Sequence, residues 1–276
     1  MTMMNDQLQQ ELRGFRQRTK LKFRSGNYLV KTAENDWEAQ RALALRHTNS
    51  NLNIDYDLYD YECDHLIVID EKHGRIVGAA RLSSSFHGHS FPAAQDFQLE
   101  ILLASPGEKL ECSRLCVDPF YRDGTVIGLL MRGISNYAYE TNTRFLFGAI
   151  GVGQIESDSV VVLMKYLADT GVGEFRFTVE PKPHAMMPGL PVALARFARQ
   201  RQPAGTFRLQ RIPSLMRFFI NAGAKIGLSP SIDRENNGID FFSLIDFQVA
   251  TAGLRALSRK FSGSPKAASR NLNAAK

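Results

Sequence analysis

The hydrophobic periodicity of the chain changes abruptly within one segment, residues 110–140. Residues 110–118, LECSRLCVD, read as a strand. After Pro119 and the turn YRDG at 121–124, apolar residues recur at helical spacing. That helical face consists of Val126, Leu129, Leu130, Ile134 and Tyr137. The segment therefore predicts a strand that passes through a short, glycine-containing turn into a helix.

Further strands and helices alternate on both sides of this unit. Strands are expected over 27–33, 65–70, 75–83, 144–150 and 238–246, and helices over 34–47, 157–170 and 212–223. A polar loop spans 49–64, and five of the eleven prolines make 175–211 an irregular insertion. Strands outnumber long helices, and hairpins alternate with single crossovers. The sequence therefore predicts one α/β (α+β) domain with a mixed sheet, not a doubly wound one.

The net charge of +6 is concentrated at the two ends. Residues 1–24 carry six basic and two acidic side chains, and residues 253–276 carry six basic and no acidic ones. Such ends suit nucleic acid, anionic lipid headgroups or an acidic protein, or are solvated tails that only aid solubility. We expect a basic N-terminal segment at 1–24, a domain at 25–248 and a basic, disordered tail at 249–276.

Several classes of protein are not expected from this composition. No apolar run reaches the length of a membrane span, and the N-terminus has no signal-peptide core, so we expect a cytoplasmic protein. Three cysteines do not make a disulfide framework. Cys112 and Cys116, four apart on a strand, are expected to face one way as core thiols, and no metal site is expected. Aromatic residues do not interleave with basic ones, so no nucleic-acid partner is expected.

The strand–turn–helix unit has a chemical implication of its own. Free N–H groups and the helix dipole at the start of the helix favour an anion, such as a pyrophosphate or a phosphopantetheine phosphate. Gly124 allows the backbone to approach such a group closely, and Arg122 adds positive charge.

This unit resembles the acyl-donor-binding unit of the GNAT acyltransferase superfamily. The joint pattern YDxxCDHLIVID, GAARL and ExSRxCVxPxYRDG is similar to N-acyltransferases that take fatty acyl groups from acyl carrier protein, and most of all to ornithine N-acyltransferases. N-acyl amino acid synthases and acyl-homoserine-lactone synthases are further relatives. The likeness covers about residues 27–170 and 211–245. It implies a mainly antiparallel sheet flanked by helices, with a C-terminal extension.

The resemblance also implies site residues. The matching positions are Glu111 and Arg114 of the E-x-x-R strand, Asp57 and Asp60 of the D-x-x-D pair, Arg81 of G-x-x-R-L, and Arg46 at the end of the first helix. At this arginine, relatives read Arg-x-x-Val-Phe, whereas this chain reads Arg46-His47-Thr48-Asn49-Ser50. They also read Glu-Leu-Gly-Arg where this chain has Glu-Cys-Ser-Arg. The glycine-rich phosphate loop is degenerate, as expected for a donor carried by a protein.

The residue types suit acyl transfer from a thioester to an amine. Glu111 is the candidate base, with Arg114 beside it as the second catalytic candidate. Asp57 and Asp60 would hold a cationic amino acid, while Arg46, Arg81 or Arg114 would bind its carboxylate. The donor site would include Val117, whose backbone region would polarise the thioester carbonyl, and the turn residues Arg122, Asp123 and Gly124. No cofactor is expected beyond the acyl-phosphopantetheine of the carrier protein.

Alternatives remain open at each of these positions. Glu111 and Arg114 are also read as an ion pair between strands, Asp57 and Asp60 as loop residues, and Arg81 as a salt-bridge partner. The insertion suits a lid over an acyl chain, an interfacial segment on an anionic membrane, or a packed surface loop.

The leading function is transfer of a fatty or 3-hydroxy fatty acyl group from acyl carrier protein to an amino acid, with ornithine as the first acceptor. Acidic carrier protein would dock on the basic N-terminal segment, and an anionic membrane face is a further partner. The alternatives are an N-acyl amino acid synthase for glycine or tyrosine, a signal-molecule synthase, and a non-catalytic module that binds acyl chains or membranes.

Overall fold

The computed structural model describes residues 14–49, 57–153, 156–173, 177–199, 212–234 and 237–249. The tail predicted at 249–276 therefore lies outside the described residues except for Val249. Residues 50–56 of the loop predicted at 49–64 and residues 200–211 at the end of the insertion also lie outside them.

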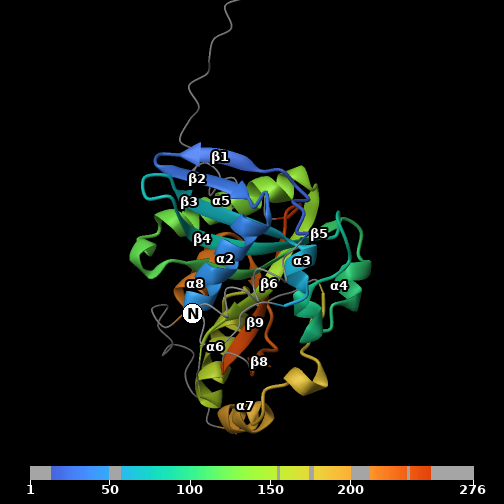
Figure 1. The fold of residues 1–276 in the computed structure, drawn as a ribbon. Helices are drawn as coiled ribbons and strands as arrows, with labels where there is room; N and C mark the ends of the chain where they lie inside the picture. Colours follow the sequence, from blue (N-terminus) through green and yellow to red (C-terminus); the bar gives the residue numbers. More distant parts are fainter. Residues whose placement is uncertain are drawn as a thin grey trace, which may run out of the picture.

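A nine-stranded sheet forms the centre of the molecule (Figure 1). Its strands are β1 (Lys22–Ser25), β2 (Tyr28–Thr32), β3 (Asp64–Asp70), β4 (Arg75–Ser84), β5 (Glu108–Val117), β6 (Thr143–Gly151), β7 (Lys225–Ile226), β8 (Ser231–Asp233) and β9 (Gly238–Asp246). The order is β1-β2-β3-β4-β5-β6-β9-β7, and β8 also pairs with β9. β5 and β6 run parallel, and the other described pairs are antiparallel. The predicted mixed, mainly antiparallel sheet is confirmed.

Helices cover both faces of this sheet because apolar side chains alternate along its strands. On β3, Leu66 and Val68 pack in a cluster with α5 (Thr125–Glu140), whereas Ile67 packs in a cluster with α2 (Asp36–Asn49). We call these the α5 face and the α2 face. Side chains of α6 (Ser157–Asp169) and α8 (Ser214–Asn221) join the cluster on the α5 face.

The α2 face carries two separate apolar clusters. One lies under α2, and the other joins α4 (Glu100–Ala104) to phenylalanines of β6 and β9, including Phe147 and Phe242. The short helices are α3 (Tyr59–Glu62), η1 (Pro92–Gln95), η2 (Pro119–Tyr121) and η3 (Pro183–Ala185). The two clusters leave room between them on the same face for polar side chains.

The structure changes the predicted start of the domain. The expected start of the domain at residue 25 falls at the end of β1, and the preceding segment packs on the domain. Phe15 and Leu21 are buried, and the backbone N–H groups of Arg18 and Thr19 each donate to Asp64 at 2.8 Å.

The insertion expected at 175–211 is also more regular than its prolines indicate. It contains α7 (Leu190–Arg199), which packs on α6 and leaves Val192 63% exposed. None of the helices in the described ranges combines the length and the apolar character that crossing a membrane requires.

A β-bulge at Arg114 interrupts β5. Ala79 and Arg81 of β4 oppose Cys116 and Ser113, so β5 holds one more residue than β4 between these pairs. Arg114 takes the left-handed backbone conformation, with φ of 53°. The bulge reverses the alternation of side chains, so that Cys112 packs on the α5 face and Cys116 on the α2 face. The prediction that both thiols face one way was therefore wrong.

Candidate active site

A cleft of about 440 Å³ opens where the parallel strands β5 and β6 diverge. Their pairing ends at Glu111 and Phe147, next to the bulge. Gly148 lies at the closed end, where a Cβ atom would come within 2.3 Å of the Cys112 carbonyl oxygen. Only a glycine therefore fits here, and this close approach fixes the point at which the strands separate.

The two sides of the cleft differ in chemistry. Towards the α5 face the lining is apolar, and it includes Leu115, Ile150 and the α8 residues Leu215 and Phe219. The remaining lining includes the polar and charged residues Ser113, Arg114, Asp233 and Asp240. A molecule bound in the cleft would therefore meet an apolar wall on one side and charged groups on the other.

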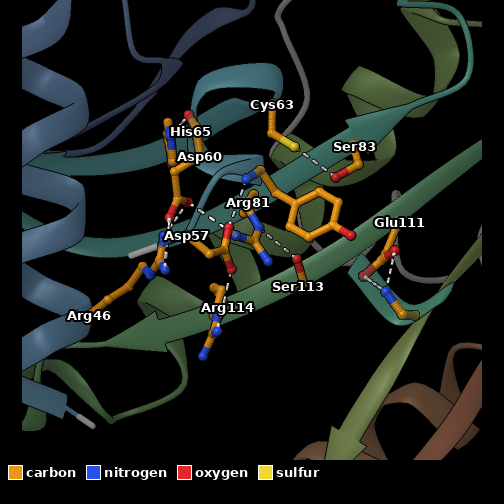
Figure 2. A network of polar contacts seen from close by, with 12 residues as sticks. Arg46, Asp57, Asp60, Cys63, His65, Arg81, Ser83, Glu111, Ser113 and Arg114 are labelled. Atoms are coloured by element: carbon orange, nitrogen blue, oxygen red, sulfur yellow. Dashed lines mark hydrogen bonds and ion pairs between the residues drawn. The ribbon is translucent and has the colours of Figure 1, made fainter. Parts of the chain in front are cut away.

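A network of ion pairs lies beside this polar side, on the α2 face (Figure 2). Arg81 is its centre: Nη1 donates to Asp57 Oδ1 at 2.5 Å and to Asp60 Oδ1 at 3.3 Å, and Nε donates to Ser113 Oγ at 3.1 Å. Arg114 Nη2 reaches Asp57 Oδ2 at 3.5 Å. Asp57 thus joins an arginine of β4 to the arginine of the bulge, which lines the cleft.

The far end of the network is fully buried. Arg46 Nη1 donates to Asp60 Oδ1 at 2.6 Å, and the backbone N–H of Asp57 donates to Asp60 Oδ2 at 3.0 Å. Burial alone would raise the pKa of Asp60, but the guanidinium groups of Arg46 and Arg81 outweigh burial and hold that pKa below its ordinary value. Arg46 and Asp60 therefore support the network from inside, while Asp57 and Arg114 remain partly exposed, at 30% and 25% of their side chains.

Glu111 lies apart from this network in Figure 2. Its carboxylate is buried and accepts the Ala93 backbone N–H at 3.1 Å on both oxygens. Burial raises the pKa of Glu111 to about 7, although the Ala93 N–H and the charge of Arg81 oppose the shift. A carboxyl group with a pKa near 7 is suited to exchange a proton at neutral pH.

The residues predicted to bind the donor lie at the other end of β5. Arg122 Nε donates to the Val117 carbonyl at 3.1 Å, and its Nη2 donates to Asn49 Oδ1 at 2.6 Å. Gly124 has φ of 99°, and the Asp123 carboxylate accepts the Thr125 N–H at the start of α5. Asp123 thus stabilises the first turn of α5, and Arg122 joins this turn to the end of α2.

Three residues at the site were not predicted from the sequence. The Arg81 guanidinium lies 5.6 Å from the centre of the Tyr59 ring. Ser113 accepts a hydrogen bond from Arg81, and Asp240 reaches the cleft from β9. Ser113 is the third residue of the recognised E-x-x-R segment and could have been found there, whereas nothing in the sequence marks Asp240. In the described ranges, no three His, Cys, Asp or Glu side chains gather as metal ligands.

Comparison with known proteins supports an acyltransferase of the GNAT type. Residues 41–132, about a third of the chain, match the acetyltransferase (GNAT) domain family. Two relatives of this chain each carry the name L-ornithine N(alpha)-acyltransferase. The protein of Agrobacterium fabrum is 25% identical over 198 residues, which is 67% of this chain and 65% of that protein. The protein of Rhodobacter capsulatus is 28% identical over 205 residues, 71% of this chain and 76% of that protein.

The match thus spans slightly less than two thirds of the Agrobacterium protein. Among solved structures, FeeM, an N-acyl amino acid synthase from uncultured soil microbes, aligns with a TM-score of 0.49 at 10% identity. That alignment covers 88% of this chain and 99% of FeeM.

Proposed function

We propose that the protein transfers a fatty or 3-hydroxy fatty acyl group from acyl carrier protein to the α-amine of an amino acid, with ornithine as the acceptor. The cleft between β5 and β6 carries this proposal, because it has one apolar and one charged side. An acyl chain suits the apolar side, and a zwitterionic amino acid suits the charged side. The names of the two bacterial relatives support ornithine.

In the proposed reaction, the acceptor's ammonium first loses a proton to Glu111, through a water molecule because this carboxylate is buried. The neutral amine then attacks the thioester carbon, a C–N bond forms, and the carbonyl electrons move to the oxygen. Collapse of this tetrahedral intermediate breaks the C–S bond. The thiolate of the phosphopantetheine leaves and takes up the second proton, which the attacking nitrogen releases as the amide forms. The reaction therefore needs no covalent intermediate on the protein.

The other predicted residues receive proposed roles that follow their exposure. Arg114 lines the cleft and binds the acceptor's α-carboxylate, with Asp57 holding its guanidinium in place and Arg81 holding Asp57. The buried pair Arg46 and Asp60 positions Arg81 and does not touch the substrate. This assignment differs from the initial expectation that Asp57 and Asp60 bind the cation of the acceptor.

The donor is proposed to approach from the start of α5. The phosphate of phosphopantetheine would meet N–H groups of the first turn of α5 after Thr125, whose own N–H donates to Asp123. The pantetheine arm would enter the cleft past Val117. The basic ends of the chain favour an acidic carrier protein as the donor over free coenzyme A. An anionic membrane face remains a second proposed partner for these ends.

Incubation of the purified protein with a loaded acyl carrier protein and a pool of amino acids tests this function. The proposal expects release of free thiol together with the mass of N-acylornithine. An N-acylglycine or N-acyltyrosine product would keep the reaction and replace the acceptor. Absence of thiol release with every acyl carrier protein and with acyl-coenzyme A would refute the enzymatic function.

A further inference from the structure

Asp240 brings a negative charge to the cleft from a strand outside the recognised motifs. It lies on β9 opposite Gly151 of β6. Its neighbours Ile239 and Phe241 pack on the α5 face, so Asp240 points to the α2 face, as Phe242 does. The Asp240 carboxylate thus lies on the face that also carries Glu111 and the arginine network.

Small residues line the bottom of the cleft between Asp240 and Arg114. Strand β6 runs between them, and beyond Phe147 its residues on this face are Ala149 and Gly151. A Cβ atom on Gly151 would lie 3.3 Å from Asp240 Oδ1. Because paired strands lie about 4.8 Å apart, β5 and β9 are separated by roughly 10 Å or more. A positive and a negative side chain therefore face each other across a gap that a single amino acid can bridge.

The charge of Asp240 is poorly compensated. Among the described residues, none forms a hydrogen bond or an ion pair with its carboxylate. Burial raises the pKa of Asp240 to about 7, the negative charges of Asp233 on β8 and Asp96 after η1 add to the shift, and Arg114 opposes it. Asp57 and Asp60 differ in this respect, since arginine side chains already occupy their carboxylates.

We propose that Asp240 binds the side-chain ammonium of a dibasic amino acid acceptor and so selects ornithine over neutral amino acids. This inference rests on the proposed function and identifies its acceptor class. With the α-carboxylate on Arg114 and the side-chain ammonium on Asp240, the α-amine of the acceptor lies over the floor of the cleft. There it faces the point where the strands diverge and the thioester enters. A neutral acceptor would leave the partly buried carboxylate of Asp240 without a counter-charge.

The test compares ornithine with norvaline, which has the same carbon chain but no side-chain amine. The variant D240N keeps the shape of the side chain and removes its charge. The matched control is D246N, on the same strand but outside the cleft, where Asp246 pairs with Arg144 at 3.4 Å. We expect kcat/KM for ornithine to fall roughly 10- to 100-fold in D240N, the usual loss for a hydrogen bond to a charged group. Turnover of norvaline should be kept or rise, because D240N removes a carboxylate that a neutral acceptor leaves without a counter-charge, and this activity also shows that the variant folds.

The outcomes separate this inference from the proposed function. If the wild type acylates ornithine and D240N keeps the wild-type ratio of ornithine to norvaline turnover, Asp240 does not select the acceptor. If the wild type acylates no amino acid, the proposed function fails, and calorimetric titration with ornithine tests the inference without a donor. Binding that is lost in D240N and kept in D246N would support the ammonium site, and equal binding by all three proteins would overturn it.

Discussion

Replacing Glu111 with glutamine should lower catalytic activity while raising the stability of the fold at high pH. The substitution keeps the shape of a buried side chain that accepts the Ala93 N–H but removes its ability to take a proton. General-base catalysis contributes about 10²- to 10⁴-fold to rates, so kcat should fall by that factor. KM for the amino acid should change little, because Glu111 does not hold the acceptor in this account.

The same substitution should stabilise the protein at high pH. In the unfolded chain Glu111 ionises near its ordinary pKa of 4.5, and in the folded protein its pKa is about 7. The folded state therefore binds the proton more tightly, and stability is lost as pH rises from 4.5 to 7. At 1.36 kcal/mol for each pKa unit, the loss above pH 7 amounts to about 3 kcal/mol. Glutamine avoids this loss, although its single carbonyl oxygen retains only part of the contact with Ala93.

Thermal unfolding at two pH values measures this effect. For a domain of this size, each kcal/mol corresponds to about 2–4 °C, so the Tm of E111Q should exceed that of the wild type by several degrees at pH 8. At pH 5 most of the difference should vanish, because folded wild-type Glu111 is then protonated. An active E111Q would refute the role as base. A Tm below that of the wild type at both pH values would refute the burial cost.

Four further predictions concern the cleft and its partners. D57N removes the carboxylate shared by Arg81 and Arg114, so KM for ornithine should rise about tenfold in steady-state assays while the fold is kept; an unchanged KM would exclude Arg114 as the carboxylate site. F219W narrows the apolar side, so product masses from a mixture of carrier proteins should shift towards shorter chains, and an unshifted distribution would place the chain elsewhere. The ratio of kcat/KM for ornithine to that for norvaline should rise with pH through about 7 as Asp240 ionises, and should be flat in D240N. Added salt should raise KM for acyl carrier protein but not for acyl-coenzyme A, and equal effects would argue against electrostatic docking.

Periodicity was sufficient to predict most of the fold. The strand and helix around Pro119 appear as β5 and α5 because residues such as Leu110 and Leu130 each repeat with the period of their element. The two-residue strand β7 and the three-residue strand β8 were missed, since segments so short carry no period. β1 was missed because its residues alternate between exposed and half-buried positions and include Lys22 and Arg24.

The site was predictable only where residues share a local pattern. The spacing of Glu111 and Arg114 identified the central strand, but the bulge at Arg114 depends on its pairing with β4, which the sequence does not state. Whether an acidic residue is accessible also depends on tertiary contacts. Asp57 and Asp60 look equivalent in the sequence, yet Asp60 is fully buried against Arg46. Asp240 enters the site through a long-range strand pairing, for which no local signal exists.

The most direct test of the central claim is a single assay of the wild-type protein. It uses a carrier protein loaded with a 3-hydroxy fatty acyl group, ornithine as the acceptor, and mass spectrometry of the product. The account predicts N-acylornithine, acylated on the α-amine, with one free thiol released for each product molecule. Acylation on the side-chain amine would contradict the proposed orientation between Arg114 and Asp240. Absence of any acylated amino acid, with the thioester intact, would contradict the assignment of this cleft to acyl transfer.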